Sequence, residues 1–85
     1  MKSFQYFISD EVGIHARPAG LLVKEARKFK SKMTITSGTK KADLTKLMAL
    51  MGMGIRKGEN VTIEVIGEDE DEAASYLEDF FEKNL

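Results

Sequence analysis

The sequence has no cysteine and only one histidine and one proline among its 85 residues. Without cysteine, the chain can form neither a disulfide framework nor a thiolate metal site. A single histidine also argues against a structural zinc site, because such sites need several cysteine or histidine ligands. We therefore expect no disulfide bond, no bound metal and no cofactor.

Long hydrophobic runs are also absent. The longest apolar stretch, residues 47–55, is interrupted by glycines and is far shorter than the roughly 20 residues that span a bilayer. The first six residues contain no apolar segment of the kind found in secretory signals. With 85 residues, the chain has the length of one domain. We expect a single domain over residues 1–85, located in the cytoplasm and not inserted in a membrane.

Charge is unevenly distributed along the chain. Residues 1–66 carry 12 Lys or Arg against six Asp or Glu, whereas residues 67–85 carry one against eight. The basic part includes Lys24 and Arg27, and such a face is typical of nucleic-acid binding, of an acidic protein partner or of ordinary solvated surface. The strand patterns at residues 33–37 and 61–66 contain no aromatic residue on which bases could stack. This absence argues against a nucleic-acid partner.

Hydrophobic patterning predicts seven elements in the order β-α-β-β-α-β-α. Strands are expected at about residues 3–8, 33–37, 40–43 and 61–66, and helices from about residue 16, over residues 46–53 and over residues 69–83. The simplest architecture is an α+β open-faced sandwich, with three helices on one face of a four-stranded sheet. Apolar stripes predict the inward residues of the first helix as Ala19, Leu22, Val23, Ala26 and Phe29, and those of the last as Ala73, Ala74, Leu77, Phe80 and Phe81. The residues expected on the open face of the sheet are Thr34, Thr36, Thr62 and Glu64.

The most informative segment is residues 13–20, Gly-Ile-His-Ala-Arg-Pro-Ala-Gly. Proline is tolerated only in the first turn of a helix, so Pro18 places the helix start near residue 16 and His15 at or beside the N-cap. The free N–H groups of a first turn attract anions, and the planar guanidinium of Arg17 suits phosphate oxygens. A nucleophilic imidazole at such a position predicts a phosphoryl group on His15. The alternatives are a surface or capping histidine and an Arg17 that forms an ordinary salt bridge.

A second segment, near residue 50, is rich in methionine. Leu47, Met48, Met51 and Met53 lie at spacings compatible with a short helix. Methionines in this pattern are typical of a core, but flexible methionine side chains also suit a surface that binds several partners. The residues alone leave both interpretations open.

The two segments together resemble the HPr family, the histidine phosphocarriers of the bacterial sugar phosphotransferase system. Residues 13–19 resemble the active-site signature of that family, and residues 47–55 resemble its second motif at the expected distance. Residues 58–67 resemble its last strand, so that the resemblance covers essentially the whole chain. It implies an antiparallel sheet and a phosphocarrier that acts stoichiometrically and is not itself an enzyme.

The resemblance also implies partners and residue roles. His15 would accept a phosphoryl group through Nδ1 from Enzyme I and pass it to sugar-specific IIA proteins, and the carrier would act as a monomer. Arg17 and the backbone N–H groups of Ala16 and Arg17 would stabilise the phosphate. The residues implied in partner docking are Gly20, Leu47, Met48 and Met51, with Lys24 and Arg27 as a basic rim.

Two positions depart from the family pattern. Many relatives carry a regulatory serine just before the second motif, where this chain has Lys46, with Thr45 as its neighbour. We therefore expect no serine-linked regulation, with Thr45 as the one alternative acceptor. Val12 stands where many relatives have a small polar residue. The alternative function is a regulatory relative that acts mainly by binding proteins, and the presence of His15 and Arg17 argues against it.

Overall fold

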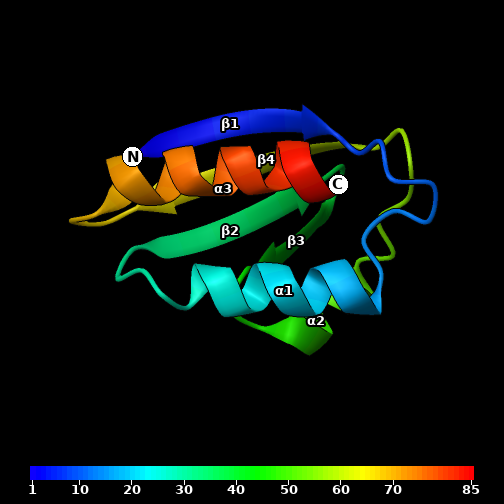
Figure 1. Cartoon of the computed structure of the whole chain (residues 1–85), viewed down its shortest axis with the longest axis horizontal. Coiled ribbons are helices and arrows are strands. Elements are labelled where there is room, and N and C mark those ends of the chain that lie inside the picture. The colour runs from blue at the N-terminus through cyan, green and yellow to red at the C-terminus, as the bar shows by residue number, and fades with distance from the viewer.

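The computed structural model describes residues 1–85, and its seven elements follow the predicted order. They are β1 (Lys2–Phe7), α1 (Ala16–Ala26), β2 (Lys32–Ser37), β3 (Lys40–Asp43), α2 (Leu47–Gly52), β4 (Asn60–Ile66) and α3 (Glu70–Asn84). The strands form one antiparallel sheet in the order β1-β4-β2-β3. The helices lie on one side of this sheet (Figure 1). The predicted open-faced α+β sandwich is confirmed.

The sheet separates a buried face from an exposed one because its strands alternate. In β4, Val61, Ile63 and Val65 are fully buried under the helices. The intervening residues face the open side, where the register places Thr34 of β2 beside Glu64 of β4. The four residues predicted for the open face are all partly exposed there, which agrees with the period-two pattern.

Helix α1 begins at Ala16, where Pro18 predicts it, and it buries Ala19 and the other stripe residues against the sheet. It ends at Ala26, so the expectation that Phe29 belongs to the helical stripe is wrong. The N–H of Phe29 bonds to the carbonyl of Ala26, three residues back, which tightens the chain into a turn. Phe29 still packs on the core, with its ring 5.5 Å from that of Tyr76.

Helix α3 packs along β1 and is anchored to the α1–β2 turn. The rings of Phe4 and Tyr6 meet that of Phe81 edge-on, at 5.8 and 5.6 Å. The carboxylate of Asp69, the N-cap of α3, accepts bonds from the Ser31 hydroxyl and from the N–H groups of Lys30 and Ser31. The Ser31 hydroxyl, followed by these backbone donors, holds the pKa of Asp69 below its usual range.

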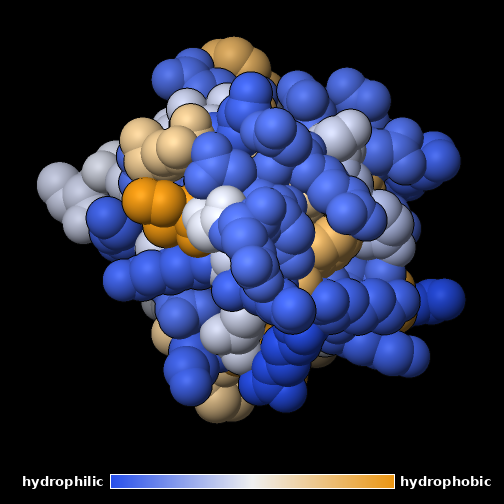
Figure 2. All heavy atoms as spheres, turned by 90° about the vertical axis from the view of Figure 1, so that its left-hand side faces the viewer, coloured by the Kyte–Doolittle hydropathy of each residue, from blue (hydrophilic) through white to orange (hydrophobic).

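The end of the molecule opposite the α1 N-terminus is mostly polar. Figure 2 shows the end that carries the β4–α3 and α1–β2 turns, where hydrophilic side chains cover most of the surface and apolar areas are small and separate. None of the three helices combines the length and the apolar character needed to cross a membrane.

Candidate functional site

His15 is the N-cap residue of α1, as Pro18 predicts, and its backbone is extended with φ −115° and ψ −176°. Its carbonyl accepts the N–H of Ala19 at 2.9 Å, but its side chain makes no hydrogen bond to the helix. The capping interpretation is therefore wrong. The imidazole is half-exposed, with 39% of its side-chain surface accessible.

The loop that presents His15 is held from two sides. The N–H of Ile14 donates to the carbonyl of Ile55 at 3.0 Å. On the other side, the N–H groups of Ser9 and Asp10 donate to the carbonyl of Leu85 at 2.6 and 2.8 Å. Gly13 has φ +78°, and a Cβ at this position would collide with the carbonyl oxygen of Ile55. Glycine is therefore required for this loop to approach residue 55.

The start of α1 offers unpaired donors beside the imidazole. The backbone N–H groups of Ala16 and Arg17 make no hydrogen bond within the protein, and the first turn contains no acidic residue. Arg17 is exposed and forms no ion pair, so the salt-bridge interpretation of this residue is wrong. Helix-terminal N–H groups and an unpaired guanidinium next to a nucleophile can hold the oxygens of a phosphoryl group.

A shallow hollow of about 310 Å³ surrounds the imidazole. Its lining residues are Asp10, His15, Arg17, Pro18, Leu21 and Asn84. Asp10 places Oδ1 3.7 Å from Nε2 of His15. Sequence reasoning missed Asp10 and Asn84, because the contacts that bring them here depend on tertiary structure. Leu21, which is 43% exposed, could have been found as an apolar residue outside the buried stripe of α1.

Helix α2 divides the methionine-rich segment between surface and core. Met48 is 79% exposed and Met51 is 37% exposed, whereas Met53 is buried. Leu47 is half-buried and packs on the core. The core interpretation is thus correct for Met53, and Met48 and Met51 lie on the surface, where partner binding stays a prediction. Helix α2, which carries the exposed methionines, packs against α1.

The basic residues near α2 differ in their contacts. Lys24 is exposed and forms no ion pair, and Lys46 is the exposed N-cap residue of α2. Arg27, by contrast, donates from Nε and Nη2 to the carbonyl of Thr45 at 3.0 and 2.8 Å. Arg27 therefore ties α1 to the segment before α2, a structural role that the sequence does not indicate. Gly20 on α1 has open space where a Cβ would point.

Thr45 is held by the carboxylate of Asp43. Its hydroxyl donates to Asp43 Oδ1 at 2.6 Å, and its N–H donates to the same oxygen at 2.8 Å. These bonds, the hydroxyl first, lower the pKa of Asp43. The hydroxyl of the alternative regulatory residue is thus engaged within the protein.

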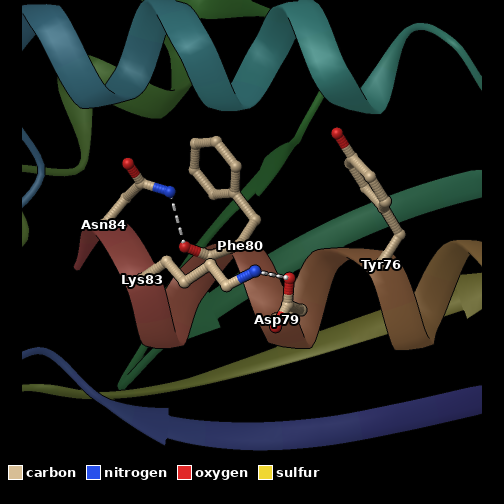
Figure 3. Close-up of a pocket in the computed structure, with 5 residues that line it drawn as sticks. All are labelled: Tyr76, Asp79, Phe80, Lys83 and Asn84. Atoms are coloured by element: carbon tan, nitrogen blue, oxygen red, sulfur yellow. Dashed lines mark hydrogen bonds and ion pairs between the residues drawn. The ribbon is translucent and has the colours of Figure 1, made fainter.

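A second hollow, of about 280 Å³, is lined by residues of α3 alone (Figure 3). Tyr76 and Phe80 point from α3 towards α1, and Lys83 forms an ion pair with Asp79 at 3.0 Å. Asn84 lines both hollows, and its amide nitrogen donates to the carbonyl of Phe80 at 3.0 Å. The polar groups that line this hollow all have partners within the protein, including Tyr76, whose hydroxyl donates to Glu25.

The site is thus a half-exposed histidine at the N-cap of the first helix of an open-faced α+β sandwich. The model of the family described as "PTS HPr component phosphorylation site" matches residues 2–83. The chain belongs to this HPr family, the phosphocarriers of the phosphotransferase system.

Individual relatives agree over nearly the full chain. Phosphocarrier protein HPr of Mycoplasma genitalium is 46% identical over 86 residues, covering 99% of this chain and 97% of that protein. Among solved structures, a mycoplasma HPr has a TM-score of 0.91 at 40% identity, covering 93% of this chain and 90% of the other. HPr of Thermoanaerobacter tengcongensis has a TM-score of 0.92 at 36% identity, with 98% and 93% covered.

Proposed function

We propose that His15 carries a phosphoryl group on Nδ1, which it accepts from the phosphohistidine of Enzyme I and passes to sugar-specific IIA proteins. The observation that carries this proposal is the half-exposed imidazole at the α1 N-cap, beside two unpaired N–H groups and an unpaired Arg17. The chain would act as a stoichiometric carrier with a phosphohistidine intermediate and not as an enzyme. No cofactor or metal enters this chemistry.

The physical basis is positioning and charge stabilisation. Phosphoryl transfer needs in-line attack and donors for the equatorial oxygens more than covalent help from side chains. The N–H groups of Ala16 and Arg17 point out of the helix start, and the guanidinium of Arg17 adds a charged donor. Comparable donors lower the barriers of related reactions by a few kcal/mol as a group.

We propose that the partners dock on the surface formed by the exposed parts of α1 and α2. The apolar contribution would come from Leu47, Met48 and Met51, and Gly20 leaves room for close approach. Lys24 and Arg27 would form the basic rim that attracts an acidic partner. Leu21, which is exposed beside His15, extends this docking surface.

We further propose that serine-linked regulation is absent, because Lys46, the N-cap residue of α2, stands at the position where the family resemblance implies a serine in many relatives. The hydroxyl of Thr45 is bonded to Asp43, which supports the same conclusion for the neighbouring position.

We treat residues 1–85 as one functional domain that acts as a monomer in the cytoplasm. Dimers of HPr from Thermoanaerobacter tengcongensis and of Crh from Bacillus subtilis are among the similar structures. Light scattering on the purified chain tests the monomer: a mass of twice 9.5 kDa would contradict it.

The test of the carrier function is phosphorylation with phosphoenolpyruvate and Enzyme I. Because the chain has a single histidine, an acid-labile and alkali-stable phosphate identifies His15 as the acceptor. His15→Ala should abolish this phosphate, and its melting temperature should be nearly unchanged because the side chain is half-exposed and makes no hydrogen bond. A regulatory relative that acts mainly by binding would take no phosphate. Appreciable phosphate on His15→Ala would refute the assignment.

A further inference from the structure

We propose that Asp10 is a positioning residue for His15, whose carboxylate keeps the imidazole proton on Nε2 and leaves the lone pair of Nδ1 free to accept the phosphoryl group. This inference rests on the proposed function, in which Nδ1 is the acceptor atom. Sequence patterns do not single out Asp10, and its role follows from three sets of contacts.

The first is the contact with the ring. Asp10 Oδ1 lies 3.7 Å from Nε2 of His15, and it is the one carboxylate within 4 Å of the ring nitrogens. This separation is longer than an N–H···O hydrogen bond. The imidazole of His15 is 39% exposed and makes no hydrogen bond, so a small rotation of this ring can shorten the contact. Catalytic hydrogen bonds are often long before the partner binds and tighten in the complex.

The second is the immobilisation of Asp10 itself. Its N–H donates to the carbonyl of Leu85 at 2.8 Å, and its own carbonyl accepts the N–H of Gly13 at 3.0 Å. Its Oδ1 also accepts the N–H of Val12 at 2.9 Å. Side chain and backbone are thus fixed before any partner arrives, so the carboxylate needs little reorganisation during the reaction. The side chain of Val12 is apolar and cannot form a hydrogen bond within the loop. The bond from the Val12 N–H to Asp10 is therefore the side-chain hydrogen bond within the loop.

The third is the choice of ring nitrogen. The carboxylate contacts Nε2, whereas no protein group pairs with Nδ1, and the N–H groups of Ala16 and Arg17 at the helix start are free of protein partners. A neutral imidazole carries its proton on one nitrogen, and the acceptor form requires that this nitrogen is Nε2. A carboxylate that accepts from one ring nitrogen selects that tautomer.

The transfer step is then balanced without a further reactant. The lone pair of Nδ1 attacks the phosphorus of the donor phosphohistidine, and the Nδ1–P bond forms while the donor N–P bond breaks. The electron pair of the broken bond returns to the donor nitrogen. The proton stays on Nε2, so that the ring of His15 acquires positive character, and the carboxylate of Asp10 offsets it.

The experiment compares Asp10→Asn with the unmodified chain. The Asn side-chain oxygen can still accept the N–H of Val12, so the loop is kept and only the charge is lost. Nitrogen-15 NMR of the unphosphorylated protein, with the imidazole neutral, should report a larger share of the Nδ1–H tautomer. Single-turnover transfer from phospho-Enzyme I should have a limiting rate lower by about threefold to fivefold, the scale of a half-exposed ion pair. The half-saturating concentration of Enzyme I should be unchanged.

Glu11→Gln is the matched control, because it removes the same charge from the same loop. Glu11 pairs with Lys57 at 2.7 Å and does not face the ring, so both readouts should keep their normal values. An unchanged tautomer ratio in Asp10→Asn would overturn the inference, as would an equal loss of rate in Glu11→Gln. An unmodified chain that takes no phosphate would instead refute the proposed function.

Discussion

Two methionines five positions apart should respond in opposite ways to truncation. Met48 is 79% exposed on α2, whereas Met53, which follows this helix, is 4% exposed and belongs to the core. Met53→Ala should lower the free energy of unfolding by about 2–5 kcal/mol, the usual loss for a buried methionine. Met48→Ala should change it by less than about 0.5 kcal/mol, because the side chain contacts little within the protein. Urea denaturation measures both.

The effect of Met48 on binding follows from the same exposure. Full burial of a methionine side chain is worth about 1.5–3 kcal/mol. With 79% of the residue still exposed, most of this, about 1–2 kcal/mol, remains available to a partner. Met48→Ala should therefore weaken the binding of Enzyme I by about fivefold to thirtyfold. Met48→Asp should weaken it further, because a carboxylate would have to lose its hydration in an apolar contact.

Isothermal titration with Enzyme I measures these affinities. Ile66→Asp is the control, because Ile66 is a 53% exposed apolar residue at the end of β4, on the open face of the sheet. It should bind Enzyme I normally. The reasoning would be refuted if Met48→Ala kept both its stability and its affinity, since Met48 would then lie outside the docking surface. An unfolded Met48→Asp in circular dichroism would contradict the surface placement.

Three further predictions concern transfer, regulation and acid stability. Arg17→Ala should still accept phosphate but more slowly in both directions, because about 1–3 kcal/mol of charge-assisted bonding is lost; rapid-quench rates equal to the unmodified chain would contradict this. An HPr kinase with ATP should leave the chain unmodified while Lys46→Ser becomes a substrate, and mass spectrometry that finds stoichiometric phosphate on Thr45 would overturn this expectation. Finally, the pKa of Asp69 is lowered in the folded state, chiefly by the Ser31 hydroxyl, so its contribution to stability is present at neutral pH and is lost as the pH falls below about 4. Asp69→Asn should therefore lose less stability than the unmodified chain between pH 5 and about pH 2 in urea titrations, and equal losses would argue against this role.

Local patterns are enough to predict most of the fold. Strand alternation and the proline rule depend on nearest neighbours along the chain, so the position of Pro18 predicts the start of α1 correctly. The same patterns fail where a helix or strand ends because of a contact with a residue distant in the sequence. Phe29 continues the helical spacing of α1, yet the chain turns before it because Asp69 captures the N–H groups that follow.

The candidate site is only partly predictable for the same reason. The approximate place of His15 at the helix start follows from the segment itself. Asp10 is close in sequence, but its orientation depends on Leu85, and no pattern in the sequence links two residues so far apart. Arg27 likewise appears as one more surface charge until its bonds to the carbonyl of Thr45 are known. Every residue has a backbone carbonyl, so the sequence does not show which of them accepts a hydrogen bond from a distant side chain.

The loop that carries His15 donates hydrogen bonds to the carbonyls of Ile55 and Leu85, and this affects the chain while it is being synthesised. His15 leaves the ribosome early, but Ile55 and Leu85, whose carbonyls hold its loop, follow much later. The central strand β4, which pairs with both β1 and β2, is also the last strand to be made. Because such distant contacts form late in folding, a nascent chain would expose the histidine without the structure that orients it. Incompletely synthesised chains should therefore accept few phosphoryl groups from Enzyme I.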